Sequence, residues 1–438
     1  MLFRSDPGLS TGRLALRAAQ QGNDVAIDRL AGRVLGAGRV DVQAVKVYAH
    51  VDRIVSGPAR DGGTLGSDAI AEDAAQFIGL MGEHAEAIAQ RLTTGAGSAL
   101  SDALRVHAEA EVRSDAKLMV QTDSAWTLPA DQARTEALGG LAAHVGDTSL
   151  TLRAKGSLIS RQAIASGLDA NTGAATSAHA GNLTLIAGAD LTAADTRALR
   201  AVDRASGLGQ LRIEARDASV PSFSGSSTGD VTLAAAGNLS IEQKNTVVLS
   251  TGAPRSEAAT AVYQQGLWFY GDQALQRDGG DLTLRAGGDV LGDDYDQYGF
   301  GEAGMAFLLS GGELGAFNSG QMIWGGSTNQ AATFSYLGAF GGGRIRVDAG
   351  GNVSNLVALA PSSGYHATAE DGSAIDVRYA GGDVQVTAGR NIVSGAYESG
   401  GRQMRLSAGR DIQRAVDGDR KSTRLNSSHS QQSRMPSS

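Results

Sequence analysis

Short stretches in which apolar and polar residues alternate recur along this chain, and glycine bounds most of them. In the segment 280–290, Leu282 and Leu284 alternate with Thr283 and Arg285. Alternation with a period of two is typical of a half-buried β-strand, whereas a helix repeats its apolar positions every three to four residues. The pattern therefore predicts short strands and excludes helical repeats.

These stretches belong to one repeated unit. It begins with glycine followed by Asp or Asn, and continues with two apolar residues separated by one other residue. An Ala-Gly pair, then Asp or Asn, and then an apolar residue complete it. Copies run GNLTLIAGADL at 181–191, GDVTLAAAGNLSI at 229–241, GDLTLRAGGDV at 280–290, GRIRVDAGGNV at 343–353 and GDVQVTAGRNI at 382–392, with a degenerate copy at 403–412. Such a unit cannot bury its own apolar face and must stack on the next unit, which is the signature of a solenoid.

The spacing of the units and the residues at their ends favour a parallel β-helix. Gly389 and Gly409 are 20 residues apart, and Gly350 and Gly389 are 39 apart. One coil therefore takes roughly 20 residues and is elsewhere doubled or padded by insertions. Gly, Asn and Asp tolerate the φ > 0 corners of a parallel coil, and the coils use Val, Ile, Leu and Ala interchangeably, unlike leucine-rich repeats. We expect an all-β fold, a parallel β-helix; about fifteen coils would make a rod on the order of 70 Å long.

Composition agrees with a thin solenoid core and narrows the classes of partner. The chain has 60 Gly and 7 Pro, and only 5% of its residues are aromatic, so Ala, Val and Leu must fill the interior. The net charge of -8 argues against nucleic acid as a partner. No run of eighteen apolar residues is present, so we expect a chain that does not span a membrane.

The pattern divides the chain into coils and insertions. We expect β-helix coils at 6–66, 98–262 and 343–418, a helical insertion at 67–97, and β-helix with aromatic and glycine-rich loops at 263–342. In the helical insertion, residues such as Ile70, Phe77 and Leu92 share one face of a helix. Ser67 or Asp68 would cap it and Gly95 would end it. Such a helix either packs against the solenoid or binds a partner, and we favour packing.

The glycine-rich loops of 263–342 hold most of the aromatic residues of the chain. Long loops on a β-helix are where recognition usually lies, and exposed aromatic residues would form a binding surface. The alternative is that they cover the side of the coil, and we favour this covering role. The candidates for a recognition loop are Trp268, Phe269, Tyr270, Trp324 and Tyr336.

The sequence contains few residues that could bind a metal ion or take part in catalysis. Asp293, Asp294 and Asp296 supply carboxylate oxygens of the kind that hold a hard cation, although an acidic turn is the favoured interpretation. The chain has no Cys, and its seven His residues form no HxxxH or HExxH pair. Nucleophile-elbow and Walker motifs are also absent. We assign no catalytic residue, no metal site and no cofactor, and we expect no enzyme.

The two ends differ in composition from the rest. Residues 419–438 (DRKSTRLNSSHSQQSRMPSS) show no alternation and no glycine corners. They resemble the translation of a sequencing adaptor, as do residues 1–5, and the expectation is that both are adaptor-derived and that the tail is disordered. The native part would then be about 6–418, a fragment of something larger, and the lack of a signal peptide carries no meaning.

The repeats resemble a known family. The units at 181–195, 229–241 and 280–291, with AGGNVSNLVALAPSSG at 349–364, are similar to the filamentous haemagglutinin family, the large exoproteins of bacterial two-partner secretion. The resemblance covers nearly all of 10–415. It implies a right-handed β-helix, export through an outer-membrane transporter barrel that recognises an N-terminal domain this chain lacks, and a secreted or cell-surface location. It also implies adhesion, aggregation or biofilm formation, with host or bacterial surface glycans or proteins as partners.

The expected function is therefore that of a structural shaft segment in a secreted adhesin. Two alternatives stay open. A carbohydrate-active β-helix enzyme, a lyase or hydrolase, predicts a cleft lined by paired carboxylates with Arg or Lys on one sheet. The stem of a contact-dependent toxin predicts the same rod with a toxin module downstream.

Overall fold

The structure is a computed structural model of the chain. It describes residues 12–30, 37–82, 84–94, 104–128, 145–170, 173, 175–202, 206–214, 222–241, 246–253, 261–264, 267–270, 278–293, 336–360, 363–368, 374–379, 381–401 and 403–413. Residues 1–5 and 419–438, Gly95, Asp294, Asp296 and Trp324 lie outside this described part.

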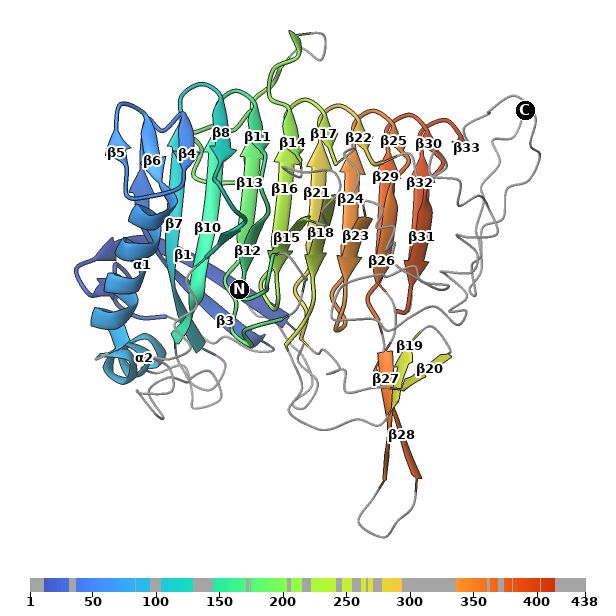
Figure 1. Ribbon diagram of the computed structural model, residues 1–438, viewed down its shortest axis with the longest axis horizontal. Coiled ribbons are helices and arrows are strands. Elements are labelled where there is room, and N and C mark those ends of the chain that lie inside the picture. The colour runs from blue at the N-terminus through green and yellow to red at the C-terminus, as the bar shows by residue number, and fades with distance from the viewer. Residues whose placement is uncertain are drawn as a thin grey trace.

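Three long sheets dominate the described part of the chain (Figure 1). Sheet 1 has eleven strands, in the spatial order β2 (Asp24–Val25), β1 (Gly12–Gln21), β3 (Ala37–Tyr48), β7 (Leu104–Ser114), β10 (Val145–Ala154), β13 (Leu183–Ala187), β16 (Val231–Ala235), β21 (Leu282–Ala286), β24 (Ile345–Ala349), β29 (Val384–Ala388) and β32 (Met404–Ala408). Sheet 2 has eleven: β33 (Ile412–Gln413), β30 (Ile392–Val393), β25 (Val353–Ser354), β22 (Val290–Leu291), β17 (Leu239–Ser240), β14 (Leu211–Ile213), β11 (Leu158–Ser160), β8 (Leu118–Gln121), β4 (Arg53–Val55), β6 (Thr64–Gly66) and β5 (Arg60–Asp61). Sheet 3 has seven: β31 (Ala396–Ser399), β26 (Val357–Ala360), β23 (Tyr336–Ala339), β18 (Thr246–Ser250), β15 (Ser222–Ser226), β12 (Ile164–Ser166) and β9 (Trp126–Thr127).

Two helices and a small fourth sheet complete the described elements. The helices are α1 (Ser67–Gly82) and α2 (Ala85–Thr93). The fourth sheet, here called the projecting sheet, is antiparallel and contains β20 (Leu267–Tyr270), β19 (Ala261–Gln264), β27 (Ser363–Thr368) and β28 (Ala374–Tyr379). In Figure 1 it lies below the stacked coils.

Successive coils pass through the three sheets in the same order. After β24 in sheet 1 the chain forms β25 in sheet 2 and β26 in sheet 3, and then returns to β29 in sheet 1 beside β24. Neighbouring coils pair in parallel, residue for residue, from β13 through β32. This architecture confirms the predicted all-β, parallel β-helix.

Coil length varies because insertions are added to a short basic coil. Hydrogen bonds link equivalent corner residues of adjacent coils. The sequence separation between the two bonded residues is 33, 48, 51, 63, 39 or 20 residues, depending on the coil. The 39-residue step is a single coil padded by the β27–β28 hairpin, not two coils. In the described part of sheet 1, ten strands run parallel, which at about 4.8 Å each gives a stack of about 43 Å. Insertions thus make the rod shorter than the value expected from fifteen coils.

The core consists of columns of identical strand positions. Leu183, Val231, Leu282, Ile345 and Val384 stack in register on the inner face of sheet 1, and all are buried. Full burial of each such side chain contributes about 1.5–3 kcal/mol. A one-residue register slip would turn the whole column outward, so the apolar alternation fixes the stacking.

Glycine begins each unit because the coils approach too closely for a side chain there. A Cβ atom on Gly280 would meet the carbonyl oxygen of Gly229 in the adjacent coil, and one on Gly382 would meet that of Gly343, both far inside van der Waals contact. At these two positions glycine is thus a steric requirement of the corner.

The Asp or Asn of the repeat forms a hydrogen-bonded ladder at the corner between sheets 1 and 2. The backbone N–H of Asp289 donates to Oδ1 of Asn238 at 2.9 Å, and Asp289 Oδ1 in turn accepts from the N–H of Asn352 at 2.6 Å. Asn391 and Asp411 continue the ladder at 3.1 and 3.2 Å. Each step satisfies a corner N–H that no strand partner reaches.

The predicted helical insertion is present, but as two helices, where the spacing predicts one. The first helix ends at Gly82, and the second begins at Ala85 with His84 as its N-cap residue. Phe77 and Ile78 of α1 and Leu92 of α2 pack on the inner face of the first strands of sheet 1, which no described strand of sheet 3 faces. The helices therefore fill the place of missing strands. Within the described residues, neither helix has the length and apolar character needed to cross a bilayer.

Candidate functional site

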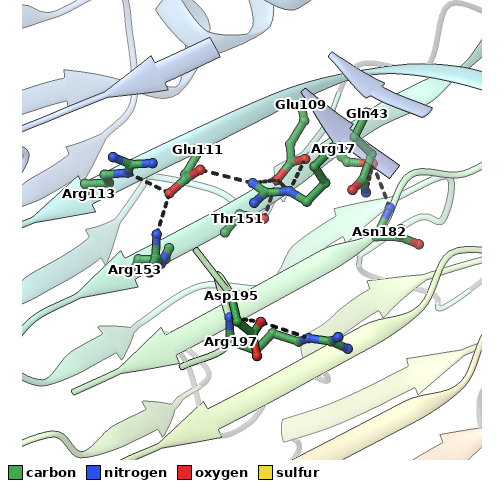
Figure 2. Close-up of polar contacts among 11 residues, drawn as sticks. Arg17, Gln43, Glu109, Glu111, Arg113, Thr151, Arg153, Asn182, Asp195 and Arg197 are labelled. Carbon is green, nitrogen blue, oxygen red and sulfur yellow. Dashed lines mark hydrogen bonds and ion pairs between the residues drawn. The ribbon is translucent and has the colours of Figure 1, made fainter. Parts of the chain in front are cut away.

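The outer face of sheet 1 carries a cluster of charged side chains on its first coils, here called the outer-face ion network (Figure 2). Its members are Arg17 of β1, Glu109, Glu111 and Arg113 of β7, and Thr151 and Arg153 of β10. They alternate with residues that point into the core, such as Ala110, Val112 and Leu152. Strand alternation therefore places the charges outside while the same strands build the interior.

Glu109 of β7 is held by side chains from two other strands of sheet 1, the adjacent β10 and β1, which lies beyond β3. Arg17 Nε donates to its two carboxylate oxygens at 3.1 and 2.8 Å, and a terminal nitrogen of Arg17 lies 2.5 Å from Oε1. Thr151 Oγ1 donates to the same Oε1 at 2.6 Å. Only 2% of Glu109 is exposed. The guanidinium of Arg17 and the hydroxyl of Thr151 thus both hydrogen-bond the carboxylate of Glu109.

Glu111 is the centre of the network, because three arginines converge on it. Arg113 Nε lies 2.6 Å and Arg153 Nη1 lies 2.9 Å from Oε1 of Glu111, and Arg17 Nη2 lies 3.0 Å from Oε2. Burial would raise the pKa of this carboxyl, but the hydrogen bonds from Arg113 and Arg153 and the charge of Arg17 outweigh it and lower the pKa to about 2. Glu111 is therefore ionised throughout the physiological range.

Arg153 is the most deeply buried charge of the network, with 1% of its surface exposed. Its second terminal nitrogen donates to the backbone oxygen of Asp190 at 2.6 Å. Asp190 belongs to a loop that turns back through an Ala189–Leu199 bridge, and Leu191 and Leu199 of this loop pack on Ile186 and Ala234, which belong to sheet 1. The loop thus covers the guanidinium from outside.

Two further polar clusters tie the first coils together. His107 Nε2 lies 2.8 Å from Asp41 Oδ1 and Nδ1 lies 2.8 Å from the backbone oxygen of Asp147, all buried. On α1, Asp73 accepts from Tyr48 at 2.6 Å and pairs with Lys46 at 2.7 Å and Arg60 at 2.9 Å.

Both members of the Asp73–Tyr48 contact have shifted pKa values. Partial burial opposes ionisation of Asp73, but hydrogen bonds from Arg60, Lys46 and Tyr48 hold its pKa well below the usual range. Burial, followed by the hydrogen bond to Asp73, raises the pKa of Tyr48. The cluster therefore anchors the helical insertion to β3 through charge as well as packing.

The outer-face ion network contains the carboxylates and arginines that the carbohydrate-active enzyme alternative requires. Its carboxylates, however, are not accessible to a substrate. A glycoside-cleaving pair needs one carboxyl free to give a proton and one free to attack or activate water. Both Glu109 and Glu111 are buried and held by arginine. The arrangement stabilises the first coils and offers no general acid.

Sequence reasoning missed this network, although a signal was present. In HAEAEVRS, residues 107–114, Glu109, Glu111 and Arg113 occupy successive outward positions of a strand. A solvated outer face is the usual meaning of such alternation. Only the pairing of β7 with β3 and β10, which are far away in sequence, reveals that Glu109, Glu111 and Arg153 are buried and that these charges are paired.

The predicted metal candidates do not form a described site. Asp293 follows β22 and is buried, whereas Asp294 and Asp296 lie outside the described residues. Among the residues that the structure describes, no group of three His, Asp or Glu side chains is arranged to hold a metal ion.

The predicted recognition residues fall in two different sheets. Trp268, Phe269 and Tyr270 lie in β20 of the projecting sheet, and Tyr336 begins β23 of sheet 3. Trp324 lies outside the described residues. The structure therefore separates Tyr336 from the other three.

Comparisons with known proteins found no protein similar to this chain. No family model matches the chain, and neither the curated proteins nor the solved structures searched contain a match.

Proposed function

We propose that this chain is a structural shaft segment of a large bacterial surface exoprotein of the filamentous haemagglutinin type. The observation that carries the proposal is the continuous stack of parallel strands, in which every described coil from β13 to β32 pairs in register with the next. Deformation of such a stack breaks many backbone hydrogen bonds together, so the stack is suited to hold a distal module away from a surface.

Three layers of interaction support stiffness along the stack. Apolar columns fill the interior, Asp and Asn ladders link the corners, and the outer-face ion network crosslinks β1, β7 and β10. The apolar columns and the corner ladders act between adjacent coils, and the ion network also reaches from β7 across β3 to β1. The role of a toxin stem asks for the same mechanics and belongs to the same proposal, with a different distal module.

Surface location and export are tested on intact bacteria that carry the source gene. Antibodies raised against the purified chain are expected to label unbroken cells or the culture medium, and deletion of the neighbouring transporter-barrel gene is expected to abolish that label. Label that appears only after the cells are lysed, with or without the transporter gene, would contradict the proposal.

A further inference from the structure

A buried histidine on the outer face of sheet 1 joins three strands at a point where strand pairing is irregular. His107 of β7 lies opposite Gln43 of β3, and only 1% of it is exposed. On its other side, the register of β7 with β10 shifts between Gly146 and Ser149. Asp147 falls within this shift, so its backbone groups need partners outside the regular strand pairing.

Both ring nitrogens of His107 face oxygen atoms. Nδ1 lies 2.8 Å from the backbone oxygen of Asp147, and Nε2 lies 2.8 Å from Oδ1 of Asp41. A backbone oxygen can only accept a hydrogen bond, so this contact requires a hydrogen on Nδ1. The backbone N–H of Asp147 donates to the backbone oxygen of His179 at 2.9 Å. The irregular position of β10 is therefore bonded on both sides.

The contact between His107 and Asp41, here called the shared-proton pair, requires one more proton. A neutral imidazole has a single N–H, which it can place on Nδ1 or on Nε2 but not on both. Nε2 and the carboxylate therefore form a hydrogen bond, together with the bond to Asp147, only if a proton lies between them. Both members of the pair are buried, so water does not replace a bond that is lost.

Charged side chains face the shared-proton pair from every strand packed against it. On β7, Arg105 and Glu109 lie on either side of the histidine, and Arg105 lies opposite Asp41 in the register. Arg17 of β1 lies in the row of the histidine, two strands away, and binds Glu109. β10 adds the buried Asp147. Two cations and two anions nearly balance, so neither sign dominates at the pair.

We propose that the shared-proton pair is a proton-dependent clamp on the first coils, which holds β3, β7 and β10 together while the proton is bound and loosens when a rise in pH removes it. In the unfolded chain both groups are in water and neither needs the shared proton. The folded state therefore keeps more protons than the unfolded state as the pH rises, and stability falls. This direction is opposite to that of Glu111, whose contribution is lost as the pH falls.

Urea unfolding of the full chain, followed by circular dichroism between about pH 5 and pH 9, tests the clamp. The unfolding equilibrium constant of the native chain is expected to rise with pH, by at most about tenfold per pH unit for one proton. Asp41→Asn is expected to flatten the profile, because an amide N–H can donate to Nε2 of a neutral ring. His107→Gln has no titrating ring and is expected to flatten it too. It decides the question if Asp41→Asn does not fold.

Two comparisons isolate the effect of the pair. Glu398 of β31 titrates in the same range, since burial raises its pKa to about 8, but it is present in every variant and cancels in the differences between them. The matched control is the contact between His50 and Asp115, whose side chains are 83% and 60% exposed. His50→Gln is expected to leave the pH profile of the native chain unchanged, because water can replace an exposed contact.

Hydrogen–deuterium exchange of the native chain locates the effect without any substitution. Protection factors, corrected for the intrinsic exchange rate, are expected to fall in β3, β7 and β10 between about pH 6 and pH 8.5 and to stay constant in β24 and β29. Three outcomes would overturn the proposal: parallel pH profiles for the native chain and the folded variants of the pair, a flattened profile in His50→Gln, or uniform loss of protection along the stack. The shaft proposal does not depend on the clamp, since the coils from β13 to β32 stack without it.

Discussion

Glu111 shows how single residues on the outside of a solenoid become structural. Its carboxylate is the common partner of Arg17, Arg113 and Arg153, which come from three strands of sheet 1. A buried ion network of this kind adds specificity of pairing, and its members become costly when one partner is lost. At the residue scale, substitution is therefore expected to have large effects at buried charges and small effects at exposed ones.

Replacement of Glu111 by Gln is expected to lower the free energy of unfolding by about 3–5 kcal/mol, because Arg153 keeps its charge in a buried place without its anion. Urea titration followed by circular dichroism measures the change. The matched control is Glu214→Gln: Glu214 pairs with the half-exposed Arg212 and Arg161, so its loss should cost about 0–1 kcal/mol. Equal effects of the two substitutions would contradict the assigned role of the network.

The low pKa of Glu111 gives the protein a specific acid sensitivity. The folded-state pKa is about 2, below the ordinary value of 4.5, so the stabilisation is complete above about pH 4.5 and disappears as the pH falls toward 2. Urea midpoints measured through this range should fall more steeply for the native chain than for Glu111→Gln. Parallel pH profiles for the two proteins would rule out this contribution.

At the scale of the element, the strand and its corner account for the repeated unit position by position. Leu282 and Leu284 enter the core columns, Gly280 occupies a point where coils approach too closely for a side chain, and Asp289 carries the corner ladder. Alternation and glycine spacing are local properties, so the sequence was sufficient to predict the strands and the parallel β-helix. Neighbours such as β7 and β10 meet only after the coil closes, which explains why the buried pairing of Glu111 with Arg153 was not predictable.

The corner ladder predicts a difference between two substitutions at one position. Asp289→Ala removes the acceptor for the N–H of Asn352 and is expected to lower the free energy of unfolding by about 1–2 kcal/mol. Asp289→Asn keeps an oxygen in the same place and is expected to unfold at nearly the native urea concentration. If the asparagine variant loses as much as the alanine variant, the acceptor is not the stabilising group.

The glycine corner predicts an effect of added volume. Gly280→Ala places a methyl group against the carbonyl oxygen of Gly229 and is expected to cost about 1–3 kcal/mol as the coils are forced apart. Thr283→Ala, at an outward position of the same unit, is the control and should change the unfolding midpoint little. A native-like midpoint for Gly280→Ala would show that the corner has room.

At the scale of the whole molecule, the coils form a one-dimensional stack whose two ends differ. The first strands of sheet 1 are covered on their inner face by α1 and α2, while the coils further along face their own sheets 2 and 3. The amphipathic spacing of residues 67–92 was enough to predict that this segment is helical and that it packs against the solenoid. It did not reveal that the helices take the place of sheet-3 strands, because that depends on where the first described strand of sheet 3 begins.

Loss of the helical packing is expected to loosen one end of the stack first. Phe77→Ala empties a buried site between α1 and the first strands and should cost about 3–5 kcal/mol locally. Hydrogen–deuterium exchange is expected to show lost protection in β1 and β3 with protection retained in β24 and β29. The neighbouring exposed Gln76→Ala is the control, and uniform loss of protection along the chain would contradict one-dimensional stacking.

The most direct test of the shaft is a distance along its outer face. The chain has no Cys, so Thr184→Cys and Arg405→Cys provide the two sites for spin labels in a double electron–electron resonance measurement. These positions lie in one column of sheet 1, five strand steps apart. A rigid stack of parallel coils predicts a single narrow distance distribution centred at about 24 Å, after allowance for the label linkers. A broad distribution, or one centred at much longer distances, would contradict a rigid stack of parallel coils.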